Sequence, residues 1–236
     1  VVDWNAEKIV LSDSSNNILS ASQISKTELD NIEGDQLSPV SIFSTSINQG
    51  EDKRENITVM ALPIGSDILP NVKEGKDFSE DKKEIIIPEN LADKGYKVGD
   101  KIKVGNNDTE LKIVGISKST YYSATPVVYS SFTTLSAIKN MNVAVADGSV
   151  NGVIVKSGKV TLKGSSSDKL KVITTSELIN NIPGYSAQKT TLSAMIYFLF
   201  LIVLLIIAVF MYVITLQKVP IFGIMKAQGI SNFLIM

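Results

Sequence analysis

The sequence predicts an α+β domain followed by one transmembrane helix and a short cytoplasmic helix. Three observations predict this architecture. No charged side chain lies between Lys189 and Lys218, and residues 192–215 are almost continuously apolar. All acidic residues precede this apolar run, so the polar part of the chain lies before it. That part shows short strand patterns separated by turns, together with two helix-start signals.

Eight segments of the domain have strand patterns, either alternating apolar and polar residues or short apolar runs bounded by turns. In chain order they are residues 4–11, 56–64, 84–88, 101–104, 110–116, 126–129, 150–155 and 170–174. The clearest pair is the hairpin at residues 101–116, because Gly105 to Asp108 supply a turn between two runs. The run Glu-Ile-Ile-Ile-Pro at residues 84–88 is typical of a buried strand.

Short helices are expected between these strands. Ser25 and Glu28 have the spacing of a capping box and predict a helix through Ile32. Thr174 and Glu177 repeat this spacing and open a helix before the apolar run. The other helices are expected at residues 89–94, stopped by Gly95, and at residues 132–139. Turns and loops are expected at Asn16-Asn17, residues 63–65, residues 74–78, Gly148, Gly158, residues 164–167 and Pro183-Gly184.

Residues 190–216 are predicted to cross the membrane as a helix. About 20 apolar residues span a hydrocarbon core of about 30 Å, and a helix pairs its backbone within the segment. A buried helix of a soluble domain is the alternative, but it would have a shorter apolar run and a polar face. Lys218 and Lys226 follow the run without any acid, so the positive-inside rule favours residues 1–189 extracellular and residues 217–236 cytoplasmic.

The composition argues against several functions. The chain has 23 basic and 24 acidic residues, and the domain before Lys189 has a mildly negative, mixed-sign surface without a basic block. Arg54 is the only arginine, which argues against nucleic acid and phosphate recognition. The chain has no Cys and no His, which excludes disulfides, a Cys/His zinc site, Cys nucleophiles and His-based triads. We therefore expect no catalytic residue, no metal site and no resident cofactor.

The segment after the apolar run is expected to form a short amphipathic helix. Pro220 suits a first helical turn, where its missing N–H costs nothing. Phe222, Met225 and Lys226 have helical spacing, and Gly229 is a natural stop. From the residues alone, this helix is equally consistent with lying on lipid headgroups and with docking to another protein.

Three stretches carry a resemblance to a known family. The segment YVITLQKVPIFGIMKAQGIS resembles the loop after the second transmembrane helix of FtsX-like, MacB-type ABC transporter permeases. The segment EGKDFSEDKKEIIIPENLADKGYKVGDKIKVGNNDTELKIVGI is similar to the core of their extracytoplasmic domain. The segment GYSAQKTTLSAMIYFLFLIVLLIIAVFMYVITLQK resembles the hemin-export permeases of Gram-positive bacteria. Two residues depart from the family pattern: Ile221 stands where the family often has an acidic or polar residue, and Gln228 where it usually has an apolar one.

The resemblance implies a MacB-like periplasmic core domain and identifies the span as the second helix of a family permease. Such a permease has one helix, the external domain and three more helices, so both ends of this chain are expected to be cut edges. It further implies a partner ATPase in the cytoplasm, which supplies the hydrolysis, and a second permease copy. The residues expected to contact the ATPase are Lys218, Phe222, Gly223, Met225, Lys226 and Gly229.

The resemblance also suggests hemin as the transported cargo. Haem iron accepts His, Cys, Met or Tyr as axial ligands, and this chain has only the last two. The candidate ligands are Tyr185, then Tyr122, then Met195, while Tyr197 and Tyr212 are expected to be interfacial anchors. Two alternatives stay open: an exporter of the same architecture for an antimicrobial peptide, antibiotic or lipoprotein, and a single-span extracellular binding or sensor module.

Overall fold

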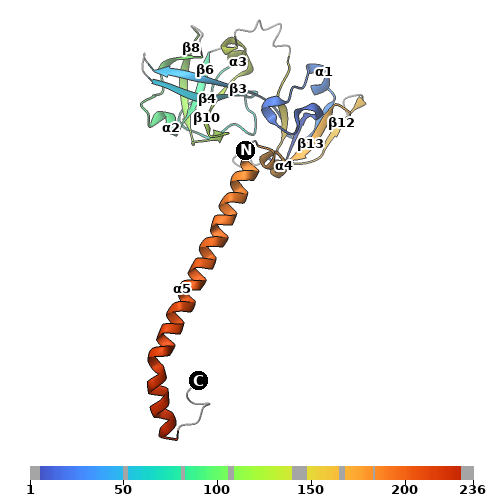
Figure 1. Ribbon diagram of the computed structural model, residues 1–236. Coiled ribbons are helices and arrows are strands. Elements are labelled where there is room, and N and C mark those ends of the chain that lie inside the picture. Colours follow the sequence, from blue (N-terminus) through green and yellow to red (C-terminus); the bar gives the residue numbers. More distant parts are fainter. Residues whose placement is uncertain are drawn as a thin grey trace. The chain divides into compact units, whose positions relative to one another are not determined.

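The structure is a computed structural model, and it describes residues 6–49, 53–80, 83–105, 109–139, 148–164, 168–182 and 184–229. The chain divides into two compact units, the first ending at residue 183 and the second beginning at residue 184. The first unit is a domain of mixed strands and short helices, and the second contains one long apolar helix (Figure 1). The expected fold class, an α+β domain followed by one candidate membrane span, is confirmed.

The strands are β1 (Lys8–Ser12), β2 (Ile32–Gly34), β3 (Leu37–Gln49), β4 (Lys53–Ala61), β5 (Val72–Gly75), β6 (Glu84–Pro88), β7 (Lys101–Val104), β8 (Glu110–Ser117), β9 (Tyr121–Tyr122), β10 (Thr125–Ser130), β11 (Gly152–Val155), β12 (Val160–Leu162) and β13 (Leu170–Thr174). The helices are η2 (Asp13–Ser15), η3 (Leu19–Ala21), α1 (Lys26–Leu29), α2 (Glu89–Ala92), α3 (Phe132–Ile138), α4 (Thr175–Asn180) and α5 (Tyr185–Ala227).

Six strands of the large sheet close into a ring. β3 pairs with β4, β4 with β10, β10 with β6, β6 with β8, β8 with β7, and β7 returns to β3. Each of these strands contributes residues to one buried cluster, and in β4 they are the alternate residues Ile57, Val59 and Ala61. Since alternate residues of a strand point to one face, this cluster is the interior of the ring.

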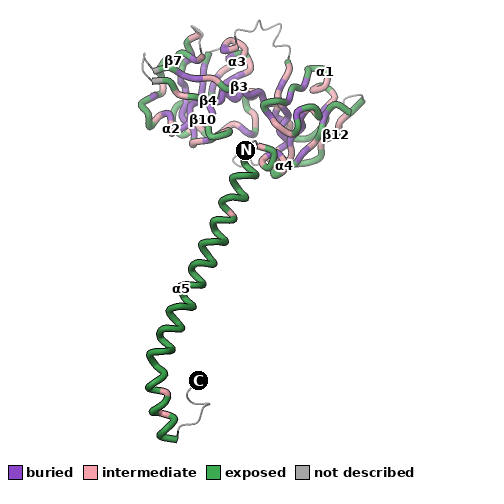
Figure 2. The backbone as a smooth tube through the Cα atoms, in the orientation of Figure 1, coloured by how far each residue is buried: buried purple, intermediate pink, exposed green. Residues whose placement is uncertain are grey.

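β3 also joins the ring to three further strands of the same sheet. Residues 37–40 pair with β11, and β11 continues to β1 and β13. Residues 41–49 pair with β4. Pro39 lies in the first part, where β4 no longer pairs with β3, so its missing N–H leaves no gap in that ladder. One long strand therefore belongs to both halves of the domain. Figure 2 shows buried segments in each half.

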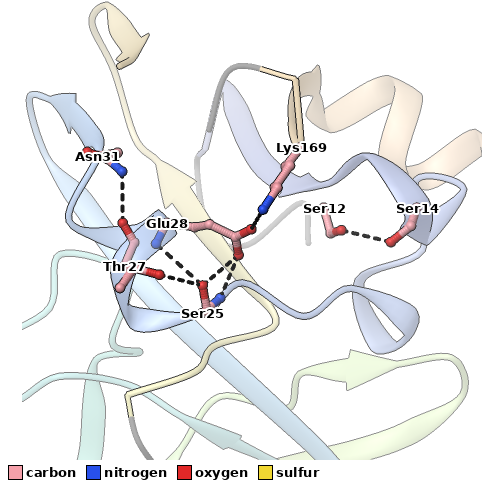
Figure 3. Close-up of polar contacts among 7 residues, drawn as sticks. All are labelled: Ser12, Ser14, Ser25, Thr27, Glu28, Asn31 and Lys169. Atoms are coloured by element: carbon pink, nitrogen blue, oxygen red, sulfur yellow. Dashed lines mark hydrogen bonds and ion pairs between the residues drawn. The ribbon is translucent and has the colours of Figure 1, made fainter. Parts of the chain in front are cut away.

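The capping box predicted at Ser25 is present in full. The Ser25 backbone N–H donates to Glu28 Oε2 at 2.9 Å, and the Glu28 N–H donates to Ser25 Oγ at 3.4 Å (Figure 3). Lys169 Nζ lies 4.0 Å from Glu28 Oε1. The Ser25 contacts, with smaller help from Lys169, lower the pKa of Glu28. The helix ends at Leu29, so its expected extension through Ile32 is wrong: Ile32 begins β2 and is buried.

β6, β7 and β13 have the predicted bounds, and the ends of the other predicted strands are shifted by one to four residues. β6 matches residues 84–88 and is buried throughout. The hairpin of β7 and β8 is present, although residues 106–108 of its turn lie outside the described residues. The loop expected at residues 74–78 is partly wrong, because Glu74 and Gly75 belong to β5. The strand expected from residue 4 begins at Lys8, and residues 1–5 are not described. The sequence patterns missed β2, β3, β5, β9 and β12.

At Thr174 only half of the second predicted capping box forms. Thr174 Oγ1 accepts a hydrogen bond from the Glu177 N–H at 3.2 Å, as expected at the start of α4. The Glu177 carboxylate instead accepts a hydrogen bond from Asn17 Nδ2 at 3.2 Å and lies 3.6 Å from Lys171 Nζ. α4 is therefore attached to the N-terminal segment of the domain by a contact that local spacing does not reveal.

Candidate functional site

The apolar run predicted to span the membrane is part of α5. At about 1.5 Å per residue, the 43 residues of the helix extend about 65 Å, and residues 192–215 account for about 36 Å of this length. None of its residues is buried in the structure (Figure 2). A helix that is apolar on all sides and covered by nothing in its own fold has the surface expected of a lipid-facing span.

Hydroxyl groups at both ends of the apolar run are satisfied within the helix. Thr190 and Thr191 donate to the carbonyl oxygens of Ser186 and Ala187, both at 2.9 Å. At the other end Thr215 donates to the carbonyl oxygen of Met211 at 2.7 Å. A hydroxyl without a partner in an apolar medium costs several kcal/mol, whereas these bonds return to the preceding turn. The polar borders of the run are therefore compatible with contact with the hydrocarbon region.

α5 continues past the apolar run without interruption, so the expectation of a new helix starting at Pro220 is wrong. Pro220 lies inside α5. Its ring removes the N–H that would pair with the Leu216 carbonyl, so the helix has one hydrogen bond fewer at this turn. About 18 Å of helix follows Thr215, at 1.5 Å per residue. The segment expected to contact an ATPase thus belongs to the same continuous helix as the candidate span.

The predicted coupling residues mostly share one side of this extension. Lys218, Phe222, Met225 and Lys226 follow one another at helical spacing and fall within about 100° of the helix circumference. Gly223 lies off this stripe. Gly229 lies just past the helix with φ +84°, and its N–H donates to the Lys226 carbonyl oxygen at 3.1 Å. The predicted stop at Gly229 is therefore confirmed.

Two of the three candidate haem ligands lie on α5. Tyr185 is its first residue, and Met195 is 62% exposed. They are ten positions apart, which corresponds to about 15 Å along the helix, so the pair from one helix is too widely spaced to hold one iron atom. Tyr197 and Tyr212 are also exposed, near the two ends of the run, as expected of interfacial residues. The structure describes α5 and the domain as separate units, so it does not bring Tyr185 or Met195 together with Tyr122.

Tyr122, the third candidate, lies in the domain and is half-buried. It lines a small cavity of about 90 Å³ together with Ser20, Leu178 and Ile182. Burial raises the pKa of the Tyr122 hydroxyl, and hydrogen bonds with Ser20 oppose this only in part. The phenol form is therefore favoured over the phenolate. The contact with Ser20 joins the β9–β10 hairpin to η3, and Leu178 of α4 completes the lining of the cavity. Sequence reasoning missed it because the three segments are far apart in sequence.

The described residues contain no group of three acidic side chains arranged to hold a metal ion. Several acids form surface ion pairs, such as Lys73 with Glu89 at 2.6 Å and Lys94 with Glu55 at 2.7 Å. Such pairs contribute at most about 1 kcal/mol each, and they serve the fold.

The sequence of this chain is similar to those of known permease proteins. A hemin transport system permease protein, HrtB, of Staphylococcus epidermidis is 33% identical over 174 residues, which cover 74% of this chain and 48% of that protein. The HrtB protein of Staphylococcus haemolyticus is 28% identical over 230 residues, covering 96% of this chain and 62% of that protein. The chain is homologous to HrtB permeases. It spans about half to three-fifths of the length of these HrtB relatives. No family model matches the chain.

Two solved structures resemble the domain that precedes α5. The extracellular domain of the ABC-type transporter YknZ from Gram-positive bacteria has a TM-score of 0.45 at 16% identity, covering 69% of this chain and 86% of that chain. The periplasmic region of MacB from Actinobacillus actinomycetemcomitans has a TM-score of 0.48 at 10% identity, covering 77% and 95%. The predicted location in the cell membrane is confirmed by the HrtB relationship together with α5, the one helix among the described residues that is long and apolar enough to span.

Proposed function

We propose that this chain is part of the permease of an ABC-type exporter of hemin, with two permease copies and a cytoplasmic ATPase in the working complex. The domain before α5 lies outside the cell and residues 217–236 lie in the cytoplasm. The hemin assignment rests on the HrtB relatives, which are described as hemin transport permeases. The continuity of α5 from Tyr185 to Ala227 is the single observation that supports the mechanism best.

In this mechanism α5 transmits motion from its cytoplasmic end to its outer end as one continuous helix. The ATPase binds the stripe of Lys218, Phe222, Met225 and Lys226, and closing of the ATPase displaces this end of the helix. Because no loop separates the stripe from the apolar run, the displacement tilts the span and moves its outer end next to the domain. Coupling of this kind requires an element with two arrangements whose equilibrium ATP shifts. Phe222 supplies the apolar contact, and the two lysines supply the charged ones.

Single aspartate substitutions in the intact permease test the docking role. We expect Phe222→Asp or Met225→Asp to reduce ATPase association at least about tenfold, as for a central apolar contact of an interface. Ile224→Asp is the matched control, because Ile224 is equally apolar, 61% exposed and on the opposite side of the same turn. ATPase association that is equally reduced by all three substitutions, or by none, would contradict the proposed docking face.

The candidate hemin ligands are Tyr185, Tyr122 and Met195, proposed in that order. Tyr185 and Met195 are exposed on the helix, where a flat apolar macrocycle could approach from the membrane, whereas Tyr122 is half-buried. The double variant Tyr185→Phe/Tyr122→Phe of the intact transporter is expected to change the haem absorbance and to reduce protection of cells against hemin. Unaltered absorbance with full protection would refute these ligands. If the parent transporter protects cells against a peptide but not against hemin, the cargo is the peptide.

A further inference from the structure

The domain contains a groove that the proposed transport path does not use. It has a volume of about 670 Å³, which is within the range of small-molecule sites. One wall is a single side of α3, formed by Phe132, Leu135, Ser136 and Lys139. The other wall comprises residues 20–23 and 148–151, and β3 provides the floor. Every one of these segments belongs to the first unit, so the groove lies within one compact domain.

Hydrogen bonds hold the floor and the second wall together. Asn151 Nδ2 donates to the Ser22 carbonyl oxygen at 2.7 Å, and Asn151 Oδ1 accepts from the Ile42 N–H at 2.8 Å. Ile24 and Val150 form a β-bridge behind this wall. The polar groups of Asn151 are therefore occupied by the fold. Hydroxyls of the lining are also used by the fold, since Ser136 Oγ donates to the Phe132 carbonyl oxygen at 3.0 Å and Ser22 Oγ accepts from the Ser12 N–H at 2.9 Å. Lys139 is the charged side chain among the described lining residues.

Lys139 stands at the end of the α3 wall as a half-buried cation. Its Nζ lies 5.3 Å from the centre of the Phe43 ring, and burial lowers its pKa. Among the described residues no carboxylate forms an ion pair with it, and those lining the groove include no acid. A partly desolvated cation beside an apolar surface formed by Leu29, Phe132, Leu135 and Val150 favours a ligand with both an anionic and an apolar part.

We infer that this groove binds a small amphipathic carboxylate, with the apolar body along α3 and the acid at Lys139. Three features specify this class: an apolar wall, a cation at its end that forms no ion pair with a described residue, and a volume that suits one small molecule. The site is separate from the candidate haem ligands and from the ATPase stripe. It therefore stands or falls independently of the proposed function.

Cysteine protection in the full chain, reconstituted in lipid nanodiscs, tests the inference. Because the chain has no cysteine, Ser136→Cys places a single thiol in the groove and Glu110→Cys places one on β8, away from it. The probe is 1-pyrenebutyrate, and the control ligand is the uncharged 1-pyrenebutanol. We expect pyrenebutyrate to slow maleimide labelling of Ser136→Cys at least about fivefold and to leave Glu110→Cys unchanged.

The charge dependence decides the ligand class. Half-protection by pyrenebutanol should need about tenfold more ligand than by pyrenebutyrate, as for one charge-assisted contact. Lys139→Gln in the Ser136→Cys chain should abolish this difference, and Lys139→Arg should keep it, with unfolding midpoints matching the parent. Equal protection by the acid and the alcohol in the parent, or no protection by either, would overturn the inference.

Discussion

Membrane insertion of α5 should tolerate one lysine at the centre of the helix but not three. Residues 192–215 contain 16 Leu, Ile, Val and Phe residues. On the insertion scale each contributes about −0.3 to −0.6 kcal/mol, so together they favour insertion by about 5–10 kcal/mol. A lysine at the helix centre costs about 3 kcal/mol, so the single variant Leu204→Lys should still insert. The triple variant Leu201→Lys/Leu204→Lys/Leu205→Lys costs about 9 kcal/mol plus the lost leucines, enough to cancel the gain.

The assay is the fraction of full chain that stays in the membrane pellet after carbonate extraction. We expect almost all of the Leu204→Lys chain and less than half of the triple variant in the pellet. A second triple variant, Leu216→Lys/Val219→Lys/Ile221→Lys, lies on the extension beyond the run and should remain membrane-bound. Full retention of the central triple variant, or loss of the outer one, would refute the placement of the hydrocarbon region at residues 192–215.

Three further predictions concern the stability of the domain, measured by denaturant unfolding of the full chain. Glu28→Gln should cost up to about 1 kcal/mol at neutral pH. The folded-state pKa of Glu28 lies below its ordinary value of 4.5, so this contribution is present above that value and is lost as the pH falls through the lowered pKa, where the parent and Glu28→Gln should converge. Gly75→Ala should lower the free energy of unfolding by about 2–4 kcal/mol, because φ is +88° and the new Cβ would meet the Val114 carbonyl oxygen. Gly65→Ala is the control: φ is +71° there but the space is open, so the cost should be only about 1 kcal/mol. Tyr122→Phe should cost about 1 kcal/mol through loss of the Ser20 hydrogen bond, and an unchanged midpoint would mean that this bond does not hold the hairpin to its neighbours.

Elements with strong local signals could be predicted from the sequence. β6 is a continuous apolar run bounded by Glu84 and Pro88, and the capping box at Ser25 fixes the start of α1. The apolar run of α5 could be predicted because its apolar residues are consecutive in the sequence and the prediction needs no distant partner. In each of these cases the information lies within a few neighbouring residues, so pattern and propensity suffice.

Elements that depend on distant partners could not be predicted. β3 is rich in serine and contains Pro39, so its sequence lacks the expected strand pattern, and its pairing with β4, β7 and β11 stabilises it. Closure of the ring has no local signal at all. The same holds for the candidate sites: the side shared by Lys218, Phe222 and Met225 follows from helical spacing, but the contact of Tyr122 with Ser20 does not. A helix start was wrongly predicted at Pro220 because proline is common in a first helical turn. The helix formed by the apolar run instead continues through Pro220.

The central claim is that α5 crosses the membrane once, with the domain outside and the coupling stripe in the cytoplasm. The most direct measurement uses single cysteines at Ser123 in the domain and at Gln228 after α5, labelled with a membrane-impermeant maleimide. In intact bacterial cells, Ser123→Cys should be labelled and Gln228→Cys should be labelled only after permeabilisation. Labelling of Gln228→Cys in intact cells, with Ser123→Cys protected, would contradict the topology and the transport mechanism built on it.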